Sequence, residues 1–120
     1  MLLGRLSSAA LLMSGMAALV APERVTSALD LSPRSPRGIA ETRAGLGGTY
    51  AALGGWAFVT ASPAAQMAVG ATWLGAAGAR VASLAFDRPR TDAAFWSYLA
   101  AELAFGCLAI GTARQRTSRK

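Results

Sequence analysis

The sequence predicts an all-α fold, a four-transmembrane-helix antiparallel bundle. Residues 44–79 contain no Asp, Glu, Lys or Arg, and charged residues make up only 15% of the chain, against about 25% in an average soluble domain. A soluble amphipathic helix shows water a charged face at every turn or so. An apolar run of about 18 or more residues is typical of a helix that spans a bilayer. Lipid is therefore the expected solvent of these segments.

We expect a single transmembrane domain over residues 1–113 and a basic tail over residues 114–120 that frays. A short interfacial helix is expected over residues 25–31, in a proline-rich loop. The first segment could also be a secretory signal, but Leu19 fits the small-x-small cleavage pattern poorly, so a retained helix is favoured. The four helices are predicted at about residues 2–21, 39–60, 63–86 and 93–113.

Local signals mark two of the helix starts. Ser62 is a natural N-cap and Pro63 suits the first helical position, while Thr91 or Asp92 can cap the last helix. The short connections make these helices antiparallel neighbours, and four spans place both termini on one side. The Lys/Arg count of the two sides ties, five against five, and only the basic tail, which no acidic residue neutralises, favours termini in the cytoplasm. The membrane is expected to be a bacterial inner (cytoplasmic) membrane.

The net charge of +6 does not indicate nucleic-acid binding, because the basic residues lie in loops and at the ends of apolar segments. They do not form a stripe with interleaved aromatic residues. The chain has no histidine and a single cysteine, Cys107. No disulfide, metal site or cofactor is therefore expected.

Four ionisable residues inside the apolar segments mark the candidate site: Glu41, Arg43, Arg80 and Glu102. With a rise of about 1.5 Å per residue, all four lie in the same half of the bilayer, at depths of about 3 to 13 Å. Glu102 is too deep and too short to reach the headgroups, so we expect it to pair with Arg80. Glu41 and Arg43 would complete a ring beneath this pair, or would snorkel to the interface, as Arg80 could also do.

Residues seven apart share a helix face, which adds polar and aromatic side chains to the same region. The possible ligand pocket consists of Tyr50, Gln66, Trp73 and Tyr98. Three roles remain open for the charges: an ion-pair network that fixes helix register, a pocket for a small molecule, lipid or quinone headgroup, and a proton or ion path.

Small residues recur every four positions and predict close helix packing. Packing within the chain is favoured over a dimer face. The two stripes are Gly47, Ala51 and Gly55, and Ala71, Gly75 and Ala79.

No catalytic constellation is present in the sequence, which has no triad, phosphate loop or acidic metal cluster. A non-enzymatic protein is expected, an accessory or scaffolding subunit of a larger membrane complex. The alternative is a binder or carrier of a small amphipathic ligand, a lipid or quinone, in the intramembrane pocket. The expected partners are the lipid bilayer and other membrane subunits or a second copy of the chain.

The motif Glu41-Thr42-Arg43-Ala44 followed by Gly47-Gly48 carries a resemblance, together with GARVASL and YLAAELAFG later in the chain. The chain resembles a bacterial family of small four-helix membrane proteins of unknown function, similar in architecture to DoxX-like proteins. The resemblance implies a four-helix integral membrane fold and no established activity. DoxX-like relatives are associated with membrane oxidoreductase systems, which supports the quinone or accessory-subunit idea.

Overall fold

The computed structural model describes residues 2–119, and within this part the chain is all-helical, with no strand. The predicted all-α class is therefore confirmed. Because α3, η1 and α4 follow one another without a break, residues 36–60 form one continuous helix. The elements are α1 (Leu2–Val20), α2 (Pro22–Ala28), α3 (Pro36–Thr42), the π-helical segment η1 (Arg43–Gly48), α4 (Thr49–Thr60), α5 (Pro63–Phe86) and α6 (Ala93–Thr117).

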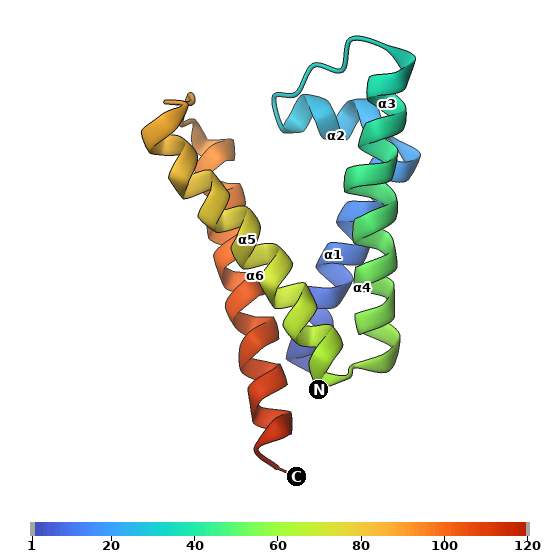
Figure 1. Cartoon of the computed structure of the whole chain (residues 1–120), viewed down its shortest axis with the longest axis vertical. Coiled ribbons are helices and arrows are strands. Elements are labelled where there is room, and N and C mark those ends of the chain that lie inside the picture. Colours follow the sequence, from blue (N-terminus) through green and yellow to red (C-terminus); the bar gives the residue numbers. More distant parts are fainter. Residues whose placement is uncertain (1, 120) are drawn as a thin grey trace.

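The helices form two arms that diverge like a V (Figure 1). One arm consists of α1 packed along η1 and α4, and the other consists of α5 packed along α6. The arms meet at the end where both termini lie, which we call the narrow end. At the opposite, wide end, the short helix α2 lies across the space between the arms (Figure 1).

The sizes of the side chains explain why the arms converge at one end only. Towards the narrow end most of the fully buried residues are small or medium-sized: Ser7, Ser8, Ala57, Ala65 and Val69 are each 0% exposed, beside the larger Leu11 and Gln66. Such residues let helix backbones approach closely. Towards the wide end the inner faces instead carry large side chains, among them Tyr50, Trp73, Arg80 and Tyr98.

The predicted caps of the last two helices are present. Ser62 Oγ accepts a hydrogen bond from Ala65 N at 3.2 Å, and Asp92 Oδ1 accepts one from Phe95 N at 3.0 Å. Each satisfies one of the backbone donors that a helix start leaves free.

Three helix boundaries differ from the expected ones. The second long helix begins at Pro36 rather than residue 39, because Ser35 accepts from Gly38 N at 3.1 Å and caps it. The short helix expected over residues 25–31 covers residues 22–28 instead, with Pro22 at its first position. The last helix continues to Thr117 rather than ending at residue 113, so most of the basic tail is helical.

The π-helical segment η1 was not expected. Thr49 closes the wider turn, because its backbone N–H donates to the carbonyl oxygen of Ala44, five residues earlier. The Thr49 hydroxyl donates to the same oxygen at 3.1 Å. A π-helical turn inserts one residue into the helical repeat. The faces before and after η1 are therefore rotated relative to each other, which breaks the seven-residue alignment of Arg43 with Tyr50.

The two stripes of small residues have different environments. Gly47 is buried against Leu19 of α1, and Ala51 backs onto Gly15, so the first stripe packs within the chain as expected. On α5 the expectation was wrong: Ala71 is exposed, and Gly75 has no neighbouring atom where a Cβ would lie. The close contact between α5 and α6 is made instead by Gly70 and Gly106.

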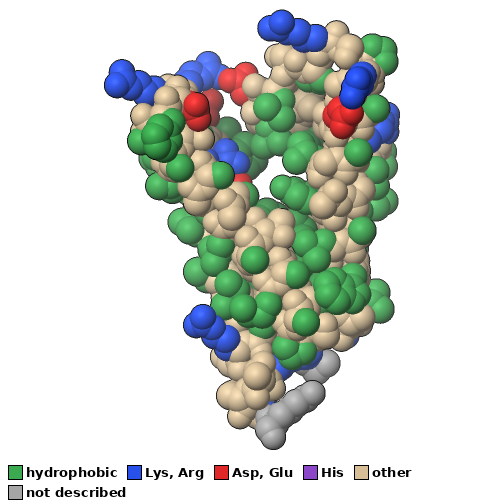
Figure 2. Space-filling view, in the orientation of Figure 1, with side chains coloured by type: hydrophobic (Ala, Val, Ile, Leu, Met, Phe, Trp, Pro, Cys, Tyr) green, Lys and Arg blue, Asp and Glu red, His purple; other side chains and the backbone are tan. Residues whose placement is uncertain are grey.

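Two of the helices, α1 and α6, are long and apolar enough to cross a membrane, judged by length and composition. The distribution of charge along the molecule fits this length. In Figure 2 most charged side chains lie near the two ends, and hydrophobic side chains lie between them.

Candidate functional site

The centre of the candidate site is an ion pair between the two helices of one arm. Arg80 of α5 donates from Nε to Glu102 Oε2 at 3.0 Å and from Nη2 to Glu102 Oε1 at 2.7 Å. The Glu102 side chain is 9% exposed and the Arg80 side chain 24%. This two-bond geometry matches the planar guanidinium to the carboxylate and is among the stronger pairings in proteins.

Aromatic rings hold the guanidinium in place. The Arg80 Cζ lies 5.5 Å from the Phe95 ring centroid and 5.6 Å from that of Tyr98. Both distances suit cation–π contacts. Because Phe95, Tyr98 and Glu102 all belong to α6, one helix supplies the counter-charge and both rings.

The predicted ring of four charges is not formed. Glu41 pairs with Arg37 one turn earlier at 3.5 Å, and both side chains are exposed. Arg43 donates from Nη1 to the carbonyl of Leu19, at the C-terminal end of α1. The rotation introduced by η1 directs these two residues away from the inner faces of the arms, so only Arg80 and Glu102 come together.

A cavity of about 390 Å³ lies beside this pair, between the two arms. Tyr50, Trp73 and Tyr98 of the predicted pocket line it, as do Arg80 and Glu102. Its remaining lining is largely apolar, from Ala10, Ala17, Val25, Leu29, Leu46, Ala76, Ala101 and Phe105. The cavity thus has one ion pair in an otherwise apolar and aromatic wall.

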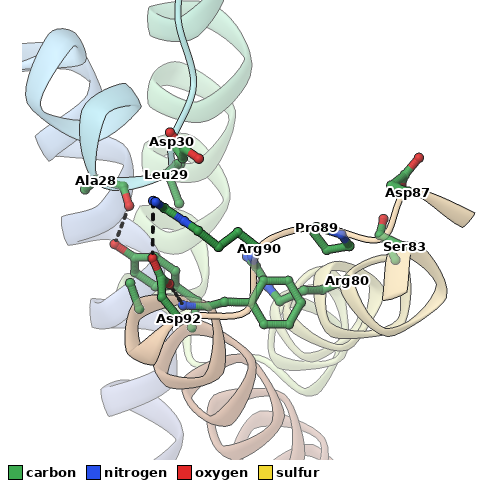
Figure 3. Close-up of a pocket in the computed structure, with 13 residues that line it drawn as sticks. Ala28, Leu29, Asp30, Arg80, Ser83, Asp87, Pro89, Arg90 and Asp92 are labelled. Carbon is green, nitrogen blue, oxygen red and sulfur yellow. Dashed lines mark hydrogen bonds and ion pairs between the residues drawn. The ribbon is translucent and has the colours of Figure 1, made fainter. Parts of the chain in front are cut away.

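A second cavity, of about 430 Å³, adjoins the first on the side of the wide end. The two share Ala28, Leu29, Arg80 and Tyr98 as lining residues. Figure 3 shows Arg90 extending from the α5–α6 loop toward Asp92, with the two charged groups 3.6 Å apart. Polar groups gather here, so the combined space is polar towards the wide end and apolar towards the middle of the molecule.

Gln66 does not belong to this pocket, contrary to prediction. It is buried near the narrow end, where Nε2 donates to Ser8 Oγ at 2.9 Å and to Ala57 O at 3.3 Å. Trp73 shares its helix face but points into the cavity, and its ring packs 5.4 Å from that of Phe105. Gln66 therefore links the two arms where they converge.

The sequence-based pocket missed the contribution of α2. Ala28 of α2 and Leu29 directly after it form a roof over both cavities, and Val25 of α2 lines the first cavity only. The roof is tied to the other arm by the Tyr98 hydroxyl, which donates to Ala28 O at 3.0 Å (Figure 3). A helix of seven residues is too short for its hydrophobic pattern to predict which part of the molecule it will cover.

Removing this tie is expected to loosen the roof. Tyr98→Phe deletes one hydrogen bond, worth about 0.5–1.5 kcal/mol, so amide hydrogen exchange at residues 22–28 should become faster by up to about tenfold. Ser97→Ala is the control, because the Ser97 hydroxyl bonds only Ala93 O within its own helix. Equal exchange at α2 in both variants would show that the tie does not hold the roof.

Within residues 2–119, no three potential metal-ligating side chains of His, Cys, Asp or Glu come together. The chemistry available at the site is that of a paired guanidinium, phenol hydroxyls and aromatic rings. These groups suit binding of a small molecule through hydrogen bonds and ring contacts.

No curated protein and no solved structure matches the chain. One family model does, over residues 2–112, and thus over nearly the whole sequence. This match agrees with the resemblance to a family of unknown function, and it covers every residue of the candidate site. The chain therefore belongs to the family described as "Domain of unknown function (DUF4345)".

Proposed function

We propose that this protein is a non-enzymatic, multi-pass protein of the bacterial inner membrane that binds a small amphipathic ligand between its arms. The observation that carries this proposal is the buried Arg80–Glu102 pair in the wall of an otherwise apolar cavity. Taking two charges out of water is costly, and a pair that only fixes helix register requires no adjoining space. The cavity therefore favours ligand binding over a purely structural role.

The lengths and charges of the helices support a membrane location with four spans. Besides α1 and α6, the continuous helix of residues 36–60 and the 24-residue α5 are long enough. At 1.5 Å per residue, α5 extends about 36 Å, against about 30 Å for the hydrocarbon core of a bilayer. Basic residues are as many at the wide end as at the narrow end. The orientation therefore rests on the basic tail, which no acidic residue neutralises and which favours the cytoplasmic side for the narrow end.

The lining chemistry supports an amphipathic ligand such as a lipid or quinone. Arginine has five N–H donors, and the bonds to Glu102 use only two of those on Arg80. The remaining donors and the hydroxyl of Tyr50 suit oxygen atoms of a headgroup. The rings of Trp73 and Phe105 and the alanines around them suit an apolar tail. The two cavities have the size of ordinary small-molecule sites, about 300–1,000 Å³.

Filling the cavity should abolish binding without touching the ion pair. Ala76 lines the cavity, whereas Ala71 lies on the exposed side of the same helix. In native mass spectrometry after gentle purification, the wild-type protein and Ala71→Phe are expected to retain a lipid or quinone. Ala76→Phe should lose it, as should Glu102→Gln, which removes the carboxylate that positions Arg80. Retention by Ala76→Phe, or no bound molecule in the wild type, would refute the proposed ligand site.

A second candidate function, an accessory or scaffolding subunit, is favoured by the exposed small-residue face of α5. Gly75 and Gly78 have open space beside them, and Ala71 and Ala79 are also exposed. Faces of this kind suit close packing of another membrane helix. In the same native spectra a stoichiometric protein partner or a homo-oligomer would support this role, and Ala71→Phe should disrupt the assembly.

A further inference from the structure

Charge at the narrow end has a single sign. The acidic residues of the chain lie in α2, α3, the loops of the wide end and within α6 at Glu102. On the face drawn in Figure 2, the narrow end accordingly carries blue atoms and no red ones. The described charged residues at this end are Arg5, Arg114, Arg116 and Arg119.

We infer that these four arginines, here called the basic collar, bind the headgroups of anionic phospholipids in the adjoining leaflet. The inference rests on the proposed membrane location but does not depend on ligand binding in the cavity between the arms. Within the described residues no carboxylate neutralises the collar, whereas at the wide end Arg37 and Arg90 each have one beside them.

Two members of the collar are held against the turn between α4 and α5. Arg116 of α6 donates from Nη1 to Ala61 O, at the left-handed residue that ends α4. Arg5 of α1 places its Cζ 5.8 Å from the Phe58 ring centroid, and its Nε is buried without a protein partner in the described part. Both arms thus bring a guanidinium to the same turn, where α5 also begins and adds the positive end of its dipole.

The surface next to the collar indicates a lipid rather than a nucleic acid or a soluble protein. Large apolar side chains are exposed beside the arginines, with Leu2 at 79%, Leu6 at 49% and Val59 at 76% exposed. A phospholipid carries a phosphate and acyl chains on one glycerol, so a single molecule matches both surfaces. A nucleic acid would match the arginines and leave the apolar residues in water.

Anionic phospholipid should therefore bind preferentially over a zwitterionic one. The test reconstitutes the full-length protein in mixed micelles of equimolar phosphatidylglycerol and phosphatidylcholine, and native mass spectrometry measures the ratio of retained lipids. The wild type should prefer phosphatidylglycerol. In Arg114→Gln/Arg119→Gln the preference should fall by on the order of tenfold, given the attraction of basic residues to anionic surfaces. This variant leaves the two arginines at the turn, and hence the fold, in place.

Arg24→Gln/Arg34→Gln is the matched control, because it removes the same charge from the wide end. Its lipid ratio should stay within about twofold of wild type, since the collar is untouched. Equal losses in the two double variants, or no preference in the wild type, would overturn the lipid inference. Failure of the wild type to enter lipid at all would instead refute the membrane location, so the two proposals can fail separately.

Discussion

Replacing Arg80 with leucine should destabilise the protein by about 3–5 kcal/mol, because it leaves the carboxylate of Glu102 buried without its partner. The Glu102 side chain is 9% exposed, so water in the adjoining cavity can replace the two lost hydrogen bonds only in part. The double variant Arg80→Leu/Glu102→Leu removes both charges and should recover most of this loss. Thermal aggregation in detergent measures the order of the three proteins: wild type, then the double variant, then the single one.

The exposed pair of Arg37 and Glu41 provides the control for this experiment. Its side chains are 89% and 70% exposed, so Arg37→Leu and Arg37→Leu/Glu41→Leu should each change stability by less than about 1 kcal/mol. If the double variant at Arg80 and Glu102 proved as unstable as the single one, the buried pair would not be the cause. The loss would then come from packing of the Arg80 stem.

Gly15→Ala should destabilise the protein by about 1–3 kcal/mol, because the added methyl group overpacks a helix interface. A Cβ at Gly15 would meet backbone atoms of Ala51 and Gly47 on the facing helix. Backbone atoms cannot turn aside as a flexible side chain can. The new methyl group must therefore push α1 away from α4 along the arm that they form.

The same substitution at Gly75 is the control and should have the opposite sign. At Gly75 no neighbouring atom lies within 4 Å of the position that a Cβ would take, and alanine favours helix over glycine by about 0.5–1 kcal/mol. Thermal unfolding in detergent should therefore place Gly75→Ala at or above wild type and Gly15→Ala below it. Destabilisation by Gly75→Ala would mean that the exposed face of α5 is covered in the native assembly, as the accessory-subunit role requires.

These expectations give the two ends of the molecule different roles. The narrow end is closed by small buried residues and by the Gln66 bonds to α1 and α4. The wide end is held across the arms by the Tyr98 bond to Ala28. Local opening is expected where buried contacts are few, so the proposed ligand should enter the cavity from the wide end.

How much of the site could be predicted depended on whether the helical repeat stayed regular. Arg80 and Glu102 lie in uninterrupted helices, so spacing and depth were sufficient to pair them. Glu41 and Arg43 precede or begin η1, and an inserted residue there rotates them off the inner face. The glycines at positions 45, 47 and 48 permit such a turn, but the same glycines suit a regular helix, so the sequence could not distinguish the two.

By itself the sequence determined the all-helical class, the cap at Ser62, a cap at Thr91 or Asp92, and the need of Glu102 for a counter-charge. Each of these depends on neighbours along the chain or on the cost of an unpaired charge. Tertiary structure alone decided that the helices diverge as two arms, that α2 covers the cleft and that Gln66 lies outside it. These features depend on which side chains meet between segments far apart in the chain, and local periodicity carries no information about such contacts.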